Sequence, residues 1–375
     1  MGRLSRAQTQ ERNRARVLRA ARAEFAERGF RDAKIDAIAE RAELTRGAVY
    51  SNFPGKRALY FTVLAEDTER AAEPPGTEPG GTPREALGAF ARAWVARLPL
   101  ASDQQHGAAR LGVDLLPEVL ADERTRLPFT QLMKLDALLL GLALERLRSP
   151  APAPAPRMVR VAEAALTTLH GASQLAAAAP GFVEPFDVVR ACERLADLDL
   201  GDGWPPPHTA HIRAQTRSAD EPWSPPPAVD AVRGGPASLT GDGVVAVLGL
   251  HRISAVEEAV RAAPPEADVT AVLVTGTPGE LAPLARLAVA EAVGCLRAAF
   301  PRSAWPRLRV VHDGSGTIAA AAGVPAVSDA TETAVRVSGG RITARADGYG
   351  ACHAAALAER GTGVSGARWP SGGGA

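Results

Sequence analysis

Cysteine and methionine are scarce in this chain, which has three of each among 375 residues. The cysteines, Cys192, Cys295 and Cys352, lie far apart, without the short spacing of a metal-binding or redox pair. Each is therefore predicted to be a small buried or neutral residue. No metal set or catalytic triad is found either, and neither a metal nor a cofactor is predicted.

Long hydrophobic runs are also missing. No stretch of about twenty residues is uniformly apolar, so no membrane-spanning helix and no membrane partner are expected. The N-terminal segment MGRLSRAQTQERNRAR is charged and has no apolar core behind it, unlike a secretory signal, which predicts a cytoplasmic protein. Hydrophobic residues make up 46% and charged residues 23% of the chain, as in globular proteins.

Charge is nearly balanced overall, with a net charge of +1, but it is unevenly distributed. Residues 1–65 carry 14 Lys and Arg against 7 Asp and Glu, whereas residues 66–205 carry 14 against 20. A basic end on an acidic body indicates nucleic-acid binding at that end. An ordinary solvated surface is the alternative, and charge alone leaves both open.

The apolar pattern divides the chain into successive parts. Apolar residues at helical spacing predict short helices over residues 1–65, with Phe25, Ile38, Val49 and Phe53 pointing inward, and longer helices over 66–200. Residues 201–240 are rich in proline and glycine and predict a linker. Strand-like runs such as VVAVLGL alternate with helical segments over 241–362, which predicts an α/β domain with a partly parallel sheet. Residues 363–375 predict a disordered tail.

The segment LTRGAVYSNFPGK, residues 44–56, predicts a helix with one flat face. Val49 and Phe53 lie one turn apart and point inward, and small residues occupy the opposite arc: Gly47, Ala48 and Ser51. Small residues let a helix lie deep in the major groove of DNA, where Arg46 can pair with guanine. Other polar side chains at the edges can reach phosphates.

Four pieces of residues 10–65 resemble the DNA-binding domain of TetR-family transcriptional regulators: VLRAARAEFAERGF, IDAIAERAEL, TRGAVYSNF and GKRALY. The resemblance implies a helix-turn-helix whose first helix, near residues 35–42, crosses the DNA backbone. It also implies a double-stranded DNA operator as partner. A homodimer is implied as well, joined through two helices near residues 157–179 and 185–199.

Two positions depart from the family pattern. Lys34 stands where a Thr or Ser usually opens the second helix, and Glu43 stands in the turn where Gly is usual. A non-glycine residue in a left-handed turn is energetically unfavourable. The predicted DNA-contacting residues lie at the start of the second helix or on and beside the flat face: Lys34, Thr45, Arg46, Gly47, Ala48, Tyr50, Ser51, Asn52 and Lys56.

Residues 66–200 resemble the family's ligand-binding and dimerisation domain more loosely. His170 and Gln174 lie one turn apart on a buried-looking helix and are candidates to bind an inducer. The predicted pocket lining is completed by apolar residues: Phe90, Trp94, Leu111, Phe129, Met133 and Leu169. Such pockets are mostly apolar, which predicts a hydrophobic small-molecule ligand. Alternatively, the two polar residues are satisfied at the dimer interface.

Residues 241–362 resemble thioredoxin-like domains of the peroxiredoxin and TlpA-like kind. The segments LRVVHDGSGTIAAAAGV and TAVRVSGGRITARADGY carry this looser resemblance. Those enzymes place a reactive cysteine at the start of the helix after the first strand, where its pKa is low. This chain has GLHRISAVEE there, without cysteine, which predicts a module without redox activity.

The function predicted from these features is a dimeric transcriptional repressor that a ligand releases from its operator, and not an enzyme. The alternative from another class is a thiol-dependent oxidoreductase or redox sensor that uses the C-terminal domain. The missing cysteine at the helix start disfavours this alternative.

Overall fold

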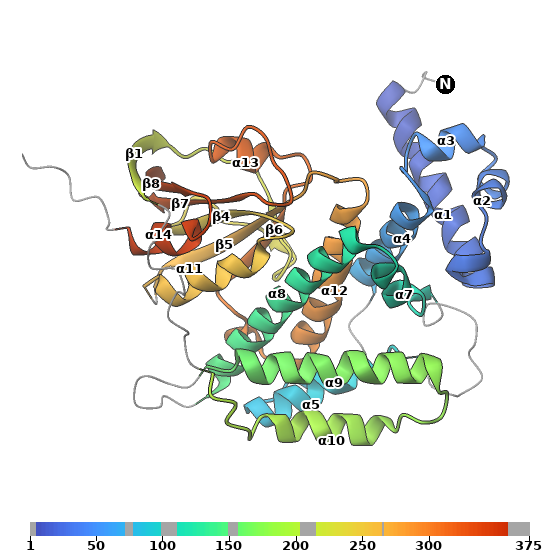
Figure 1. Cartoon of the computed structure of the whole chain (residues 1–375), viewed down its shortest axis with the longest axis horizontal. Helices are drawn as coiled ribbons and strands as arrows, with labels where there is room; N and C mark the ends of the chain where they lie inside the picture. The colour runs from blue at the N-terminus through green and yellow to red at the C-terminus, as the bar shows by residue number, and fades with distance from the viewer. Residues whose placement is uncertain are drawn as a thin grey trace, which may run out of the picture.

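The computed structural model describes residues 5–71, 78–98, 111–148, 157–202, 215–264 and 266–358. Its N-terminal part is built from helices, and its C-terminal part contains a sheet flanked by helices (Figure 1). The predicted order of an all-helical part followed by a sheet-containing part is confirmed. The tail predicted over residues 363–375 lies outside the described residues.

Three helices at the N-terminus form a unit that we call the head: α1 (Arg6–Asp32), α2 (Ile35–Arg41) and α3 (Arg46–Tyr50). A capping box begins α1, where the Ser5 hydroxyl accepts from the Gln8 amide and the Gln8 side chain accepts from the Ser5 amide. Near its end, α1 is interrupted at Gly29, whose φ of 72° is left-handed. The short helices that follow pack back against α1.

The head has its own apolar core. Four residues predicted to point inward are at most 2% exposed: Phe25, Ile38, Val49 and Phe53. The core continues into α4 (Lys56–Arg70), because the Tyr60 ring lies edge-on to Phe25 with 5.2 Å between centroids. Helix α4 thus links the head to the body.

The body contains the remaining helices of the N-terminal part: α5 (Pro83–Val95), α7 (Leu115–Leu120), α8 (Glu123–Leu147), α9 (Val159–Ala178) and α10 (Pro185–Leu195). Helices α5, α9 and α10 form a layer on the side away from the sheet (Figure 1). Close approach of α8 and α9 requires Gly141, since a Cβ there would lie 2.8 Å from the Val159 Cα.

Helix α8 is long and apolar enough to cross a membrane by length and composition alone. In the structure, 67% of its most apolar window is buried inside the molecule. Helices α5, α7, α9 and α12 (Leu281–Ala299) pack around it. A helix that is covered on several sides by other helices must be apolar over most of its circumference, which explains its composition.

The C-terminal part contains a six-stranded sheet of order β1-β8-β7-β4-β5-β6. Its strands are β1 (Arg217–Pro222), β4 (Gly243–Gly249), β5 (Asp268–Val274), β6 (Arg309–His312), β7 (Glu332–Ser338) and β8 (Arg341–Asp347). Strands β4, β5 and β6 are parallel, while β7, β8 and β1 continue the sheet in antiparallel pairs. Every residue of β4 is buried, as its continuous apolar run predicts.

Helices and short strands complete this part: α11 (Val256–Ala262), α12, α13 (Thr317–Ala321), α14 (Ala351–Leu357), β2 (Val229–Asp230) and β3 (Gly235–Pro236). Helices α11 and α14 pack against each other and against β4. Strands β2 and β3 form a separate two-stranded pair.

Helix α12 does not remain with the sheet. It packs against α4, α5 and α8 of the N-terminal part, and Figure 1 shows it beside α8. Of its 19 residues, 13 are buried, so its apolar surface is covered by helices on more than one side. A single cluster of buried residues therefore runs from the head through the body to one face of the sheet.

Residues 215–240, a described part of the predicted linker over 201–240, contain ordered structure that a linker would lack. Strand β1 within this range pairs with β8 at the edge of the sheet. Just beyond this strand, Trp223 is buried, and its indole N–H donates to the Leu239 carbonyl at 2.7 Å. Sequence analysis missed this strand because RSADEP carries charges and a proline, which are tolerated at a sheet edge but atypical of a strand.

Candidate nucleic-acid interface and ligand cavity

Helix α3 presents the flat face that its sequence predicts. Thr45 caps its first turn by accepting a hydrogen bond from the Ala48 amide at 3.2 Å. A Cβ on Gly47 would have no neighbour closer than the Thr45 hydroxyl at 3.9 Å, so this surface is open. Tyr50 is 42% exposed at the edge of the same face. This face of α3 is therefore flat and accessible to a partner.

Arg46 lies at the edge of this surface in contact with two neighbours. Its guanidinium is 5.6 Å from the centroid of the Tyr50 ring and 3.4 Å from an Asp36 oxygen of α2. A side-chain hydrogen bond with Tyr50 and the charge of Asp36 raise the Arg46 pKa. The Arg46 side chain is 60% exposed, so it is accessible to a partner.

Ser51 and Asn52 end the helix rather than extending freely from it. The Ser51 hydroxyl and the Asn52 amide both donate to the Ala48 carbonyl, at 2.9 and 2.8 Å. These bonds satisfy a carbonyl at the end of α3. Asn52 is half-buried and points toward the base of the head, whereas Ser51 stays exposed.

Lys56 has a structural role that sequence analysis did not predict. Its ammonium donates to the carbonyls of Arg31 and Ala33, at 3.0 and 2.8 Å, and lies 4.5 Å from the Phe30 ring centroid. Partial burial lowers its pKa. Two of its three donors are thus engaged within the head. One donor of the ammonium remains, and a phosphate contact of Lys56 stays a prediction.

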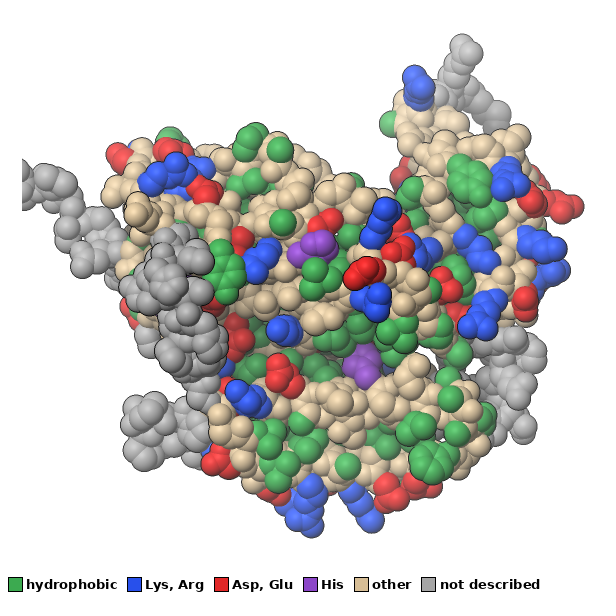
Figure 2. All heavy atoms as spheres, viewed as in Figure 1, with side chains coloured by type: hydrophobic (Ala, Val, Ile, Leu, Met, Phe, Trp, Pro, Cys, Tyr) green, Lys and Arg blue, Asp and Glu red, His purple; other side chains and the backbone are tan. Residues whose placement is uncertain are grey.

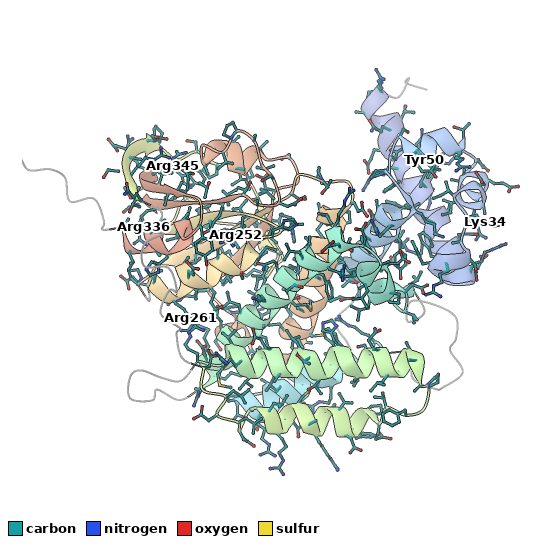
Figure 3. The ribbon with its side chains drawn as sticks, in the orientation of Figure 1. Lys34, Tyr50, Arg252, Arg261, Arg336 and Arg345 are labelled. Carbon is teal, nitrogen blue, oxygen red and sulfur yellow. The ribbon has the colours of Figure 1, made fainter. Side chains whose placement is uncertain are left out.

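Lys34 and Tyr50 lie on the head, far from the sheet (Figure 3). Lys34 is exposed before α2, and neither it nor a neighbour provides a side-chain cap for that helix. Basic side chains stand out on the outer surface of the head, with acidic ones beside them (Figure 2). In the turn, Glu43 adopts a left-handed φ of 51° and pairs with Arg16 of α1.

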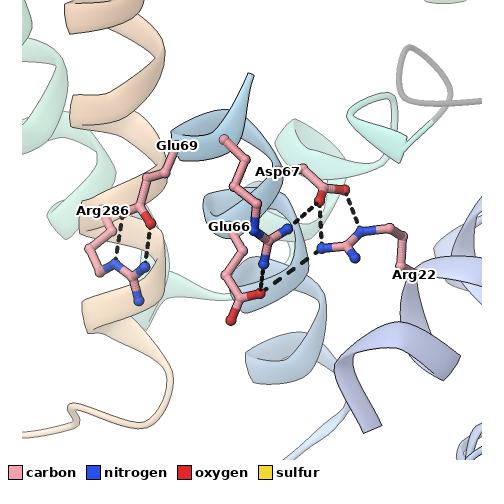
Figure 4. A network of polar contacts seen from close by, with 6 residues as sticks. Arg22, Glu66, Asp67, Glu69 and Arg286 are labelled. Atoms are coloured by element: carbon pink, nitrogen blue, oxygen red, sulfur yellow. Dashed lines mark hydrogen bonds and ion pairs between the residues drawn. The ribbon is translucent and has the colours of Figure 1, made fainter. Parts of the chain in front are cut away.

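Ion pairs connect α4 with the elements on both of its sides (Figure 4). Toward the head, Arg22 donates to Asp67 at 3.0 Å. Toward α12, Arg286 donates to both carboxylate oxygens of Glu69. These side chains are partly exposed, so their main effect is to define the register of α4 between its neighbours.

A second junction lies at the start of α4. Arg57 pairs with Asp122, before α8, and with Glu280, before α12. Close by, a Cβ on Gly279 would lie 3.0 Å from the Pro54 ring, so the loop before α12 touches the loop after α3. The sheet-containing part thus contacts the head directly.

A partly open cavity of about 130 Å³ lies between the body and α12. Four of the predicted ligand-binding residues line it: Trp94, Phe129, His170 and Gln174. The other four lie outside its lining: Phe90, Leu111 and Leu169 are buried in the core, and Met133 is partly buried against it. Leu169 is fully buried within the chain, so its side chain is not on the surface.

Polar groups converge on this cavity. Trp94 donates to the Ser173 hydroxyl at 2.9 Å, and its ring is edge-on to His170 with 4.8 Å between centroids. The buried Nε2 of His170 has no hydrogen-bond partner among the described residues. Burial lowers the His170 pKa to about 4, so the ring is neutral near pH 7.

Three polar lining residues were missed by sequence analysis: Arg97, Ser173 and Glu291. Burial raises the Glu291 pKa to about 7, and the charge of Arg97 opposes that rise. Glu291 belongs to α12, more than a hundred residues after the helices that form the rest of the cavity. Without knowledge of how α12 packs, no sequence signal could assign it to this site.

The cysteines offer no support for thiol chemistry. All three are buried, and burial raises the pKa of Cys192 and Cys295 to about 12 and raises that of Cys352 as well. A reactive thiol needs exposure and a low pKa. Among the described residues, no group of three or more His, Cys, Asp or Glu is placed to hold a metal ion.

The similarity of this chain to known protein sequences lies in its N-terminal residues, which include most of the head. Residues 17–63 match the family model of bacterial regulatory proteins, tetR family. The transcriptional regulator UidR of Escherichia coli K12 is 40% identical over 58 residues, which cover 16% of this chain and 30% of that protein. The transcriptional repressor Rv1474c of Mycobacterium tuberculosis is 39% identical over 59 residues, covering 16% and 32%. The matches thus span less than a third of these relatives.

Similar solved structures include a TetR transcriptional regulator from Rhodococcus sp. RHA1, which is 19% identical with a TM-score of 0.33. The similarity covers 50% of this chain and 95% of that chain. RolR in complex with resorcinol is 20% identical with a TM-score of 0.32, covering 52% and 98%. The helix-turn-helix geometry and the family match agree over the same residues. The head and the start of α4 therefore have helix-turn-helix geometry over the residues that match the tetR family model and the two curated relatives.

Proposed function

We propose that this chain is a cytoplasmic, dimeric transcriptional repressor that binds a double-stranded DNA operator and is released by a small hydrophobic ligand. The observation that carries the proposal is the open face of α3, with Gly47 at its centre and the exposed Arg46 and Tyr50 at its edge, within a segment that matches the tetR family. This surface suits the major groove.

In the proposed complex, Arg46 leaves Asp36 to pair with a base edge, and Tyr50 and Lys34 contact phosphates. Thr45 positions the helix start, while Gly47, Ala48 and Ser51 allow its close approach. The side-chain amide of Asn52 stabilises the end of α3 by donating to the Ala48 carbonyl. It contacts a DNA phosphate only if it donates to both acceptors.

A gel-shift assay with the DNA flanking the chain's own gene tests DNA binding. Arg46→Ala should weaken binding to a shifted fragment by roughly 5- to 200-fold and relax preference at one position per half-site. Arg126→Ala removes the same charge from an exposed site on α8 and should keep wild-type affinity. Equal affinity of both variants and the wild type would refute this docking.

We infer a homodimer formed through α9 and α10. Three large apolar side chains lie exposed at the adjoining ends of these helices: Leu175, Phe182 and Phe186. Phe182 and Phe186 are 71% and 76% exposed. Exposed apolar clusters of this kind are typical of protein interfaces, and a dimer would place two heads on successive turns of DNA.

The proposed effector site is the 130 Å³ cavity beside His170. An apolar cavity of about 150 Å³ in another protein holds benzene, so this cavity suits one ring. The neutral His170 and Glu291, whose pKa of about 7 leaves it about half protonated near pH 7, would hydrogen-bond an uncharged polar substituent on that ring. We therefore propose a small aromatic ligand with a hydroxyl or similar group.

We also propose that the sheet-containing part is a thioredoxin-like module without thiol chemistry, used for contact with the head and body. Supporting features are the parallel β4–β5 pair, the β7–β8 hairpin beside β4 and the absence of cysteine after β4. The packing of α12 in the body supports its structural use.

A further inference from the structure

A second cavity, of about 370 Å³, lies between the head and the sheet. Its polar and aromatic walls come from five elements or loops: Arg14, Asn52, Phe53, Thr275, Arg286 and His312. It is larger than the cavity beside His170 and within the range that holds drug-sized ligands. None of the residues predicted to bind a ligand lines it.

The cavity opens where parallel strands end. Strands β5 and β6 finish at Val274 and His312, and the Asp313 amide donates to the Leu273 carbonyl at 3.0 Å across this edge. The carboxyl ends of parallel strands are the usual place for ligands in open α/β sheets. Here the head covers that edge, since Asn52 and Phe53 form the opposite wall.

Two unlike charges line the cavity without pairing with each other: Arg14, and the buried carboxylate of Asp313, which accepts from the Thr317 and Ala319 amides at 3.0 and 2.9 Å. The half-buried Arg14 guanidinium of α1 lies 4.6 Å from the Phe53 ring centroid. Among the described residues, no carboxylate lies within ion-pair distance of it, whereas Arg286 on another wall is paired with Glu69. A half-buried cation without an anion is a ready partner for a ligand carboxylate.

His312 is a second polar group that faces the cavity, and the residue is partly exposed. It lines this cavity and a neighbouring one of about 620 Å³, and its ring has no hydrogen-bond partner among the residues described. Burial, reinforced by the charge of Arg286, lowers its pKa to about 4. The ring is therefore neutral and available as a hydrogen-bonding group without adding charge.

Apart from Thr62 and Asp313, the rest of the lining is apolar or glycine and includes Leu250, Leu273, Pro278, Ala282 and Pro283. We propose that this cavity binds a small apolar molecule with one carboxylate, which pairs with Arg14 while its apolar body lies against these residues. Because the walls belong to both the head and the sheet, the bound molecule holds them together. This inference does not depend on the head binding DNA.

Isothermal titration calorimetry with decanoate, decanol and decylammonium tests the site. Decanoate should bind at least tenfold more tightly than decanol, and decylammonium should bind most weakly. Arg14→Gln should abolish the preference for decanoate. Arg12→Gln removes an exposed charge from the same helix and should keep it. Equal affinities for the three probes, or an unchanged preference in Arg14→Gln, would overturn the proposal.

Ala282→Phe provides a test that leaves Arg14 in place, since its added ring would fill the cavity. It should weaken decanoate binding at least tenfold, while Ala177→Phe, in the cavity beside His170, should not. In the wild type, decanoate should also slow hydrogen exchange of amides in α1 and α3. Unchanged exchange, or inorganic phosphate binding as tightly as decanoate, would contradict a site for an apolar acid.

Discussion

Lys34, just before α2, and Lys56, at the start of α4, have different environments, and their substitution should separate stability from DNA affinity. Lys56→Met removes the donors to the Arg31 and Ala33 carbonyls and should lower the free energy of unfolding by about 1–3 kcal/mol. Lys34→Met should leave stability unchanged but reduce the slope of log affinity against log salt by about 1. Urea denaturation and salt-dependent gel shifts measure the two effects. A reversed pattern would mean that Lys56 contacts phosphate.

Glu291 should make stability depend on pH. Its pKa is about 7 in the folded protein against 4.5 unperturbed, so it binds its proton more tightly when folded. Its contribution to stability is present below pH 4.5 and is lost as pH rises toward 7. Arg97 opposes this shift, and Asp136, whose own pKa is raised by burial and by Glu291, shares the environment.

Glu291→Gln removes this ionisation. The variant should therefore gain stability over the wild type at pH 8 compared with pH 5. The difference in unfolding free energy between variant and wild type should grow by about 1–3 kcal/mol between these pH values. Urea denaturation at both pH values measures it, with the exposed Glu163→Gln as control. A difference that does not change with pH would show that Glu291 ionises normally.

At the scale of elements, α12 decides whether the N-terminal helices form a separate unit. The sequence pattern predicts that residues 1–200 stand apart behind a linker, but α12 packs on α4, α5 and α8. A chain that ends at Asp202 should therefore expose apolar surface, bind a hydrophobic dye and lose cooperative unfolding. Calorimetry and dye fluorescence measure this, with removal of residues 359–375 as control. Cooperative unfolding of the shortened chain would contradict this role of α12.

At the scale of the whole molecule, the exposed apolar ends of α9 and α10 should govern assembly. Phe186→Glu places a charge in the proposed interface and should convert the dimer to a monomer at micromolar concentration, because an unpaired buried charge is unfavourable. Leu357→Glu changes an exposed apolar residue on α14 instead and should leave the dimer intact. Light scattering distinguishes the two. A monomeric wild type, or a dimeric Phe186→Glu variant, would exclude this interface.

Local patterns in the sequence determined the elements of this protein and the character of its head. Apolar spacing predicted the inward side chains Phe25, Ile38, Val49 and Phe53, and the small residues of α3 predicted its open face. These features arise from residues within a few helical turns of one another. Local spacing therefore carries the information needed to recognise them.

Tertiary structure alone decided how the parts combine. It placed Glu291 beside His170, turned Lys56 toward carbonyls of α1 and brought Arg14 next to the ends of β5 and β6. These contacts join residues far apart in the chain, and sequence spacing says nothing about which apolar surfaces meet. Helix α12 has apolar residues suited either to the sheet or to other helices. Its place in the body follows from burying that surface against α4, α5 and α8, which is a property of the whole fold.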